Sequence, residues 1–430
     1  MIEIKEKNIY AFGGIHLIHK DIVKKKLIEL ITERLGIREN NAVYQYSDMI
    51  LSKIYTCFMG GQCAEDINYY KKGLWNMKYY EPSSADTILK LQKDLKTENE
   101  LVESKSGKQY NFNNNEKLNK LLVEVALFLG LIKSRQRYTL DFDHQFMPCN
   151  KAESKTGFKM KKGFFPGFAT INGLPVFCEN RDGNCHVKTG QLATIKKIVK
   201  TLEDAGIQID RFRLDAGSYF KELTDYLESE EETGKKLFYI RANQCAKALR
   251  AASQLTGWRT IQVGLQTYEA SSFDYEFGAH THRRVVYRQK NKSGQISAIT
   301  GDDYNYFFIL TNDKDWKEEQ VIEFYNQRGA SEKVFDELNN DFNSKHLPFS
   351  HLDENTVHMI LSCITMLVYK WLITKYSKLA GSILKATDRI KRFKFLFINQ
   401  LCYKFKETGR RIVTQIFKPS SMQMDLSGFT

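Results

Sequence analysis

The stretch Arg211-Phe-Arg-Leu-Asp-Ala-Gly-Ser218 decides the fold class of this chain. Polar and apolar residues alternate as far as Leu214, a carboxylate follows, and Ala216-Gly217 favours a turn. Residues 218–228 then have helical spacing, and 236–241 again have strand character. A strand that ends in a carboxylate and a glycine turn is typical of the sheet edge where α/β proteins bind ligands.

The residues on the N-terminal side of this stretch predict a mixed sheet. Gly163–Thr170 and Leu174–Cys178 have strand character and are joined at Asn172-Gly173, a pair strongly favoured in tight hairpins. Thr189–Ala205 follows as an amphipathic helix, and residues 138–147 alternate like a strand. Hairpin, helix, strand, helix and strand in this order predict an α/β layer.

The flanking residues suggest further regions. Residues 1–135 have helical spacing, which fits a DNA-binding domain but also fits any small helical domain. A long helix is expected from about Glu318 to Asn340. We divide the chain into a helical, DNA-binding region (1–135), the first part of the core (136–244), a β-rich insertion (245–304), the second part of the core (305–345) and a helical basic region (346–430).

Composition and charge limit the possible partners. Hydrophobic residues make up 42% of the 430 residues and prolines number only six, which excludes a largely disordered chain. Sixty-four Lys and Arg against fifty-one Asp and Glu give a net charge of +13, which indicates a polyanionic partner, most often nucleic acid. The longest uncharged apolar run, residues 359–369, is shorter than the roughly 20 residues of a membrane helix. We therefore expect a cytoplasmic, nucleoid-associated protein without a membrane partner.

Two aspartates lie in the predicted strand Thr139-Leu-Asp-Phe-Asp-His144. Because side chains alternate along a strand, Asp141 and Asp143 share one face. This periodicity alone does not separate a catalytic aspartate from its neighbour.

Two further carboxylates complete a candidate site. Asp215 ends its predicted strand, and Glu332 follows Arg328 by four residues on the predicted helix, so the two share a helix face. Taken singly, each fits a turn residue or a surface ion pair. Three converging carboxylates would repel one another unless cations bind, and hard oxygen ligands select Mg²⁺ or Mn²⁺.

Six short motifs between about residues 140 and 340 carry a family resemblance. They are Leu140-Asp-Phe-Asp-His-Gln-Phe-Met147, Gly163-Phe-Phe-Pro-Gly167, Glu179-Asn-Arg-Asp-Gly-Asn184, Phe212-Arg-Leu-Asp-Ala-Gly-Ser218, Phe238-Tyr-Ile-Arg-Ala-Asn243 and Tyr325-x-x-Arg328-x-x-x-Glu332. In this order they resemble the DDE transposases of bacterial insertion sequences, within the insertion sequence 1380 family.

The resemblance implies an RNase H-like core that a β-rich insertion interrupts before the glutamate helix. It places the catalytic residues and metal ligands at Asp143, Asp215 and Glu332, because the second aspartate of Asp-x-Asp is the usual ligand in this family. It also implies two Mg²⁺ or Mn²⁺ ions and double-stranded DNA, both the terminal inverted repeats and the target. Similar transposases pass through a hairpin intermediate and assemble as dimers on paired ends.

Two groups of residues are candidates for binding DNA. The resemblance implies that Tyr325 and Arg328 hold phosphates near the glutamate, whereas the alternative for Tyr325 is a core aromatic on a helix face. The basic C-terminal region supplies the second group, whose alternative is a solvated helix face. We predict phosphate contacts there for Arg389, Arg392, Lys394, Arg410 and Arg411.

One departure from the family motif keeps other functions open. The motif continues to a lysine seven residues after the glutamate, and Asn339 occupies that position here, with Lys333 or Lys345 as possible replacements. The first hypothesis is a cut-and-paste DNA transposase. The alternatives are an RNase H-like nuclease that does not join strands and an inactive, transposase-derived DNA-binding protein.

Overall fold

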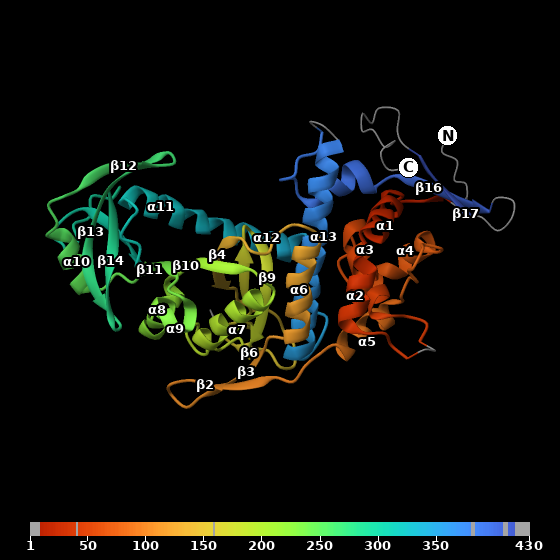
Figure 1. Cartoon of the computed structure of the whole chain (residues 1–430), viewed down its shortest axis with the longest axis horizontal. Helices are drawn as coiled ribbons and strands as arrows, with labels where there is room; N and C mark the ends of the chain where they lie inside the picture. Colours follow the sequence, from red (N-terminus) through yellow and green to blue (C-terminus); the bar gives the residue numbers. More distant parts are fainter. Residues whose placement is uncertain (1–8, 40–41, 158–159, 380–382, 407–411, 418–430) are drawn as a thin grey trace.

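A mixed sheet of eleven strands runs through the protein, in the order β12-β13-β14-β15-β11-β10-β4-β8-β9-β3-β2. The computed structural model describes residues 9–39, 42–157, 160–379, 383–406 and 412–417 (Figure 1). At the centre of the sheet, β10 (Gln208–Leu214) pairs in parallel with both β4 (Arg137–His144) and β11 (Leu237–Ala242). The predicted mixed α/β architecture is confirmed.

The hairpin at residues 172–173 joins β8 (Gly167–Ile171) to β9 (Leu174–Arg181). Asn172 and Gly173 have φ angles of 53° and 75°, the left-handed conformation that a tight hairpin turn requires at both positions. β8 pairs with β4 on its other side, and this pairing is antiparallel. The hairpin thereby fixes the order β9-β8-β4 beside the central parallel strands.

Residues 245–304 continue this sheet. After the short helix α10 (Ala246–Ser253), three antiparallel strands follow, namely β12 (Arg259–Val263), β13 (Gln266–Phe277) and β14 (His280–Lys290). β14 pairs antiparallel with β15 (Tyr304–Thr311), which itself pairs with β11. The β-rich segment is therefore bonded directly to the core strands.

The predicted long helix is divided by one tighter turn. α11 (Glu318–Asn326) leads into a 3₁₀ turn, Gln327–Gly329, and α12 (Ala330–Asn340) follows. Gly329 is a poor helix former, and 3₁₀ turns are common where helical geometry changes. The turn places Arg328 between the two helices.

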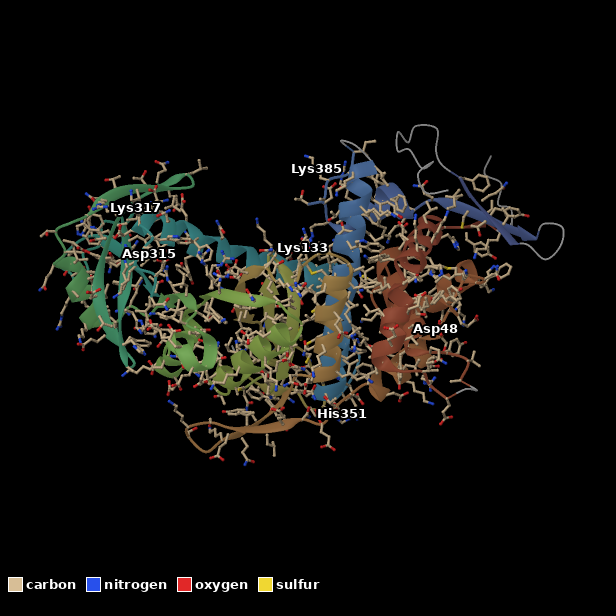
Figure 2. All side chains as sticks on the ribbon, in the orientation of Figure 1. Asp48, Lys133, Asp315, Lys317, His351 and Lys385 are labelled. Carbon is tan, nitrogen blue, oxygen red and sulfur yellow. The ribbon has the colours of Figure 1, made fainter. Side chains whose placement is uncertain are left out.

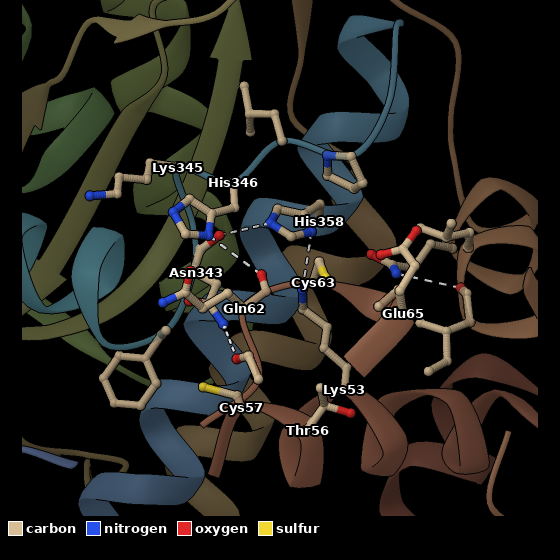
Figure 3. Close-up of a pocket in the computed structure, with 18 of the residues that line it drawn as sticks. Lys53, Thr56, Cys57, Gln62, Cys63, Glu65, Asn343, Lys345, His346 and His358 are labelled. Carbon is tan, nitrogen blue, oxygen red and sulfur yellow. Dashed lines mark hydrogen bonds between the residues drawn. The ribbon is translucent and has the colours of Figure 1, made fainter. Parts of the chain in front are cut away.

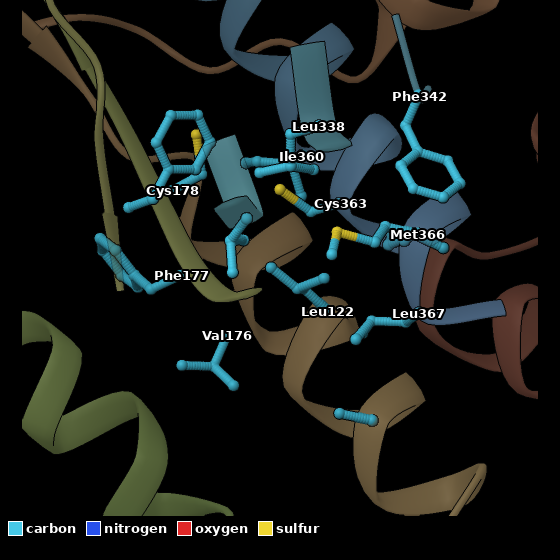
Figure 4. Close-up of a cluster of buried hydrophobic side chains, with 14 of the residues drawn as sticks. Leu122, Val176, Phe177, Cys178, Leu338, Phe342, Ile360, Cys363, Met366 and Leu367 are labelled. Carbon is cyan, nitrogen blue, oxygen red and sulfur yellow. The ribbon is translucent and has the colours of Figure 1, made fainter. Parts of the chain in front are cut away.

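The long helix α13 (Leu352–Leu379) is the central support of the N-terminal half. It packs against β9 and against α6 (Glu116–Phe128), where Cys363 and Met366 lie beside Leu122 (Figure 4). By length and composition it is the one helix in the described ranges that could cross a membrane, yet 89% of its most apolar window is buried in the protein. Its apolar surface is thus already covered by the fold.

Two segments differ from the predicted helices. Within residues 1–135, the strands β2 (Glu100–Glu103) and β3 (Gln109–Asn113) form a hairpin, and β3 joins the sheet at β9. The prediction of helix throughout residues 346–430 is also wrong, because β16 (Leu401–Lys406) and β17 (Ile412–Phe417) are antiparallel strands. The remaining helices of the two regions are α1 (Gly14–Lys25), α2 (Leu27–Leu35), α3 (Tyr46–Met59), α4 (Ile67–Leu74), α5 (Ala85–Asp94), α14 (Ile390–Phe393) and a π-helix over Lys394–Ile398.

Two polar side chains, one at the start of α3 and one just before α13, join these helices to other parts of the chain (Figure 2). Asp48, in the first turn of α3, accepts hydrogen bonds from the backbone N–H groups of Gln45 (2.8 Å) and Glu81 (2.9 Å). Near the start of α13, His351 pairs through Nδ1 with Glu153 at 2.8 Å. The contact with Glu153 joins α13 to the loop that follows β5 (Met147–Pro148).

Replacing Asn119 with alanine should destabilise the whole fold. The buried Asn119 amide on α6 donates to the Cys178 carbonyl (2.9 Å) and accepts from its N–H (2.8 Å), so it serves β9 as a neighbouring strand would. Asn119→Ala leaves both backbone groups buried without partners, which should cost about 2–4 kcal/mol in free energy of unfolding. Urea denaturation measures the loss, with the exposed Lys120→Ala as control. Equal stability of the two variants would contradict this role.

Candidate active site

Two parallel strands place Asp143 and Asp215 at one edge of the sheet. Phe142 of β4 is in register with Leu214 of β10, and each aspartate is the next residue of its chain. Burial and, second to it, the negative charge of Asp215 together raise the pKa of Asp143 to about 6. The two carboxylates are therefore electrostatically coupled.

Asp141 has a different environment from Asp143. Its carboxylate accepts hydrogen bonds from Nε (2.6 Å) and Nη2 (2.8 Å) of Arg213, the residue opposite it on β10. Arg213 also donates through Nη1 to the carbonyl of Phe324 on α11 at 2.8 Å. Asp141 thus holds the strand pair and α11 together, while Asp143 faces Asp215.

Arg328 lies against Asp143. Its Nη1 donates to Asp143 Oδ2 at 2.9 Å, and the backbone N–H of His144 donates to Oδ1 at 2.8 Å. Burial lowers the pKa of Arg328, but Tyr325, Asp143 and Asp215 outweigh this effect, so its pKa is raised. The guanidinium is accordingly part of the same charged cluster as both aspartates.

Tyr325 is 7% exposed and packs into a small core with Tyr239 and Ile322. Burial raises the pKa of its hydroxyl, and Arg328 acts in the opposite direction. Its ring therefore fits the alternative of a core aromatic on a helix face, while its hydroxyl lies toward Arg328.

Glu332 lies in the first turn of α12 and is exposed. Within the described ranges, no three His, Cys, Asp or Glu side chains are grouped as a metal site, so the predicted convergence of three carboxylates is not seen. Arg328 lies in the tighter turn at residues 327–329 and donates to Asp143, whereas Glu332 lies in α12 and is exposed. The structure brings together two of the three predicted carboxylates.

Asn339 points back toward the chain that follows β4. It is 9% exposed, and its Nδ2 donates to Oε1 of Gln145 at 2.8 Å, while its Oδ1 is buried without a hydrogen-bond partner. Lys333 is exposed, and Lys345 donates instead to Oδ1 of Asn340 at 2.5 Å. Neither lysine therefore supplies a positive charge at the buried position 339, where the family motif has its lysine.

The sequence profile of the family described as Transposase DDE domain group 1 matches residues 2–413. The chain belongs to this family of transposase domains. A search of curated proteins gave no match. Among solved structures, the chain is similar to a piggyBac transposase in a synaptic complex with hairpin DNA, with 13% identity, a TM-score of 0.41, and coverage of 90% of this chain and 79% of that one.

Transposases of the DDE type generally use divalent metal ions. The carboxylates at the carboxyl ends of β4 and β10 are the candidates to bind them. Asp143 and Asp215 offer hard carboxylate oxygens, and a cation would offset both the burial of Asp143 and the negative charge of Asp215, which raise the pKa of Asp143. This donor set fits Mg²⁺ or Mn²⁺. Arg328 already supplies one positive charge to Asp143.

Arg389, predicted to contact DNA, is paired within the protein. Its Nε donates to Asp341 Oδ2 at 2.6 Å and its Nη1 to Asp336 Oδ2 at 2.5 Å. Both carboxylates lie at the C-terminal end of α12. Arg389 therefore anchors the C-terminal region on the helix that carries Glu332.

The other basic candidates fall into two sets. Arg392 forms an ion pair with Asp388 at 3.3 Å, and burial lowers the pKa of Lys394, which packs near the end of α3. Arg410 and Arg411 lie outside the described residues. Contact of Arg389, Arg392 and Lys394 with DNA phosphates therefore stays a prediction.

Arg213 and Gln145 are site residues that the sequence analysis missed. The sequence pattern indicated the position of Arg213, because this residue alternates with apolar residues on the strand expected to precede Asp215. Gln145 lies two residues after Asp143, and its contact with position 339 depends on how α12 packs. No local pattern reveals such a contact.

Protonation of Asp143 should stabilise the fold at mildly acid pH. Because its folded pKa is raised to about 6, the folded protein keeps a proton that the unfolded chain releases near pH 4. Without divalent ions, stability should fall by up to about 3 kcal/mol as the pH rises from about 4 to about 6. Urea unfolding in EDTA measures this fall, which Asp143→Asn should abolish. Identical pH profiles for the two proteins would contradict the raised pKa.

Asp141→Asn should have the opposite effect on stability from Asp143→Asn. It leaves the buried Arg213 guanidinium without its charged partner, a loss expected to cost about 3 kcal/mol or more. Asp143→Asn instead removes a carboxylate that repels Asp215, so stability at pH 7 should hold or rise. Thermal unfolding of both variants at pH 7 makes the comparison, and a less stable Asp143→Asn protein would reverse the assignment.

Proposed function

We propose that this chain is a transposase that cuts DNA at the ends of a bacterial insertion sequence of the 1380 family and joins the freed ends to target DNA. The observation that carries the proposal is the coupled pair Asp143 and Asp215 beside Arg328. Membership of the DDE transposase family supports it. We assign the catalytic and metal-binding roles to Asp143, Asp215 and Glu332.

We also propose an RNase H-like catalytic core. The five strands β9-β8-β4-β10-β11 support it by their order and direction. The first three along the chain, β4, β8 and β9, are antiparallel neighbours, and β10 and β11 then add in parallel on the other side of β4. Asp143 and Asp215 lie on the first and fourth strands of this set, which are adjacent in space.

Each residue of the site has a defined part in the proposed reaction. Two divalent cations, when bound, would help to activate the attacking oxygen and to stabilise the leaving one. Asp143 and Asp215 would hold these cations at the carboxyl ends of β4 and β10, and Glu332 of α12 would be the third carboxylate ligand. Water attacks a phosphodiester at the end of the element and releases a 3′-hydroxyl there. This hydroxyl then attacks a phosphodiester of the target strand and displaces the 3′ oxygen of that strand.

Arg328 changes partner in this scheme. Its guanidinium now donates to Asp143, at a distance of 2.9 Å. A DNA phosphate and cations at the aspartates would compete for both members of this ion pair. Because a guanidinium can make two parallel bonds to a phosphate, Arg328 is suited to hold the scissile phosphate once it leaves Asp143.

The partners we propose are double-stranded DNA, at the terminal inverted repeats and the target, and a second copy of this chain on paired ends. The net charge of +13 supports DNA. We propose a cytoplasmic location at the nucleoid. The second candidate function is a transposase-derived protein that binds DNA without cutting it. It is favoured by the exposure of Glu332 and by the neutral Asn339 at the position of the family's lysine.

Removing any of the three carboxylates should abolish strand cleavage. Asp143→Asn, Asp215→Asn and Glu332→Gln should each lower the cleavage rate by about 10³-fold or more, the scale seen when a group is removed from a reacting centre. The assay uses labelled DNA with the element's own ends in Mg²⁺. Asp204→Asn, at the end of α7 (Gln191–Asp204), and Glu323→Gln, on α11, replace exposed carboxylates and are matched controls that should cut normally.

The same assay separates the other candidate functions. Cutting without joining of the 3′ end to a second duplex indicates a nuclease. Binding without cutting by the unaltered protein, in Mg²⁺ and in Mn²⁺, contradicts the proposal and indicates the DNA-binding alternative.

A further inference from the structure

A cavity of about 570 Å³ lies between the N-terminal helices and the segment that follows α12 (Figure 3). Its walls come from α3, the loop after α3, α5, the chain after β5, and residues 342–348. None of the three carboxylates assigned to catalysis lines it. The proposed reaction gives this cavity no role.

Positive charge dominates the lining. Lys53, Lys151 and Lys345 contribute ammonium groups, whereas the one carboxylate of the described lining belongs to exposed Glu65. Among the residues that the structure describes, no carboxylate lies within ion-pair distance of any of these lysines. Lys345 donates only to the neutral amide of Asn340.

Lys53 is the cation held most firmly by the fold. Its Nζ lies 3.0 Å from Nδ1 of His358, and Nε2 of His358 lies 3.0 Å from the carbonyl of Asn343 (Figure 3). Because a carbonyl only accepts, Nε2 is the donor and Nδ1 is left to accept from Lys53. Burial holds the pKa of His358 well below its usual range, so the imidazole is neutral.

The Lys53 ammonium is therefore desolvated beside a neutral partner. Burial lowers its pKa to about 8. An anion in the cavity would offset this charge. Lysine is a common point-charge ligand of phosphate, and His346 adds a further polar group.

Part of the wall is apolar. Ile88 and Leu89 of α5 line the cavity together with Leu347 and Pro348. Ligand sites of 300–1,000 Å³ typically combine such apolar walls with a few polar groups that orient the ligand. A cavity with lysines and an apolar wall suits a phosphate ester whose organic part lies on that wall.

We propose that this cavity binds the phosphate group of a nucleotide unit, with Lys53 as its principal counter-charge. The phosphate belongs either to a free nucleotide or to a DNA strand, and the second source rests on the proposed function. In both cases the ligand would join α3 and α5 to the segment after α12. The site is separate from the carboxylate edge of the sheet.

Two cysteines in the lining allow a direct test on the full chain. Cys63 is exposed and Cys149 is partly buried, and both line the cavity, whereas exposed Cys245 lies elsewhere and serves as the internal reference. Alkylation of each thiol is followed by mass spectrometry in EDTA, with inorganic phosphate, deoxyadenosine monophosphate or a 20-base-pair duplex as probe. At a probe concentration about ten times its Kd, alkylation of Cys149 should slow about tenfold relative to Cys245.

Variants identify the ligand-binding group. Lys53→Met removes the charge at similar volume and should abolish the protection, whereas Lys90→Met, on the exposed side of α5, should keep it. Thermal unfolding verifies that each variant is folded, and Lys151→Met replaces Lys53→Met if the latter does not fold.

Each outcome has one meaning. Protection by phosphate or the mononucleotide identifies a free ligand, and protection by the duplex alone identifies a DNA phosphate. Absence of protection by every probe, or full protection in both lysine variants, overturns the proposal. Because the assay contains no divalent ions and measures no cleavage, its failure leaves the proposed catalytic function standing.

Discussion

The parallel pairing of β4 with β10 is the constraint on which the rest of the site depends. It brings two strand ends from distant parts of the chain to one edge, and so sets Asp143 beside Asp215. The buried ion pair of Asp141 with Arg213 joins the same two strands two residues before these aspartates. A structural ion pair and a pair of coupled carboxylates thus follow one another across the same two strands.

The same ion pair connects the sheet to the helices that complete the site. Arg213 reaches the carbonyl of Phe324, which positions α11 and, through it, the turn that carries Arg328. From there α12 leads to Asp336 and Asp341, where Arg389 attaches the C-terminal region. Arg213 and Arg389 thus attach α11 to the sheet and the C-terminal region to the end of α12.

Local chemistry made much of this arrangement predictable from the sequence. The positive φ angles at Asn172-Gly173 and the carboxylate at the end of β10 follow from short-range preferences, and both were expected. Strands that pair over long sequence distances were missed, as in β3, whose partner β9 lies about seventy residues away. Tyr403 and Phe405 alternate with lysines, which is the pattern of a strand and indicated β16. The interpretation of this region as a basic helix overlooked that pattern.

The small sheet β1-β16-β17 has a consequence for synthesis of the protein. β1 (Ile9–Tyr10) pairs with Tyr403 and Cys402 of β16, and Gly14 packs directly on the backbone at Phe397. The ribosome releases the first of these segments long before it makes the second. The N-terminal region consequently reaches its final form only on a chain translated past residue 403, so a prematurely terminated product lacks part of the structure that shapes its opening helices.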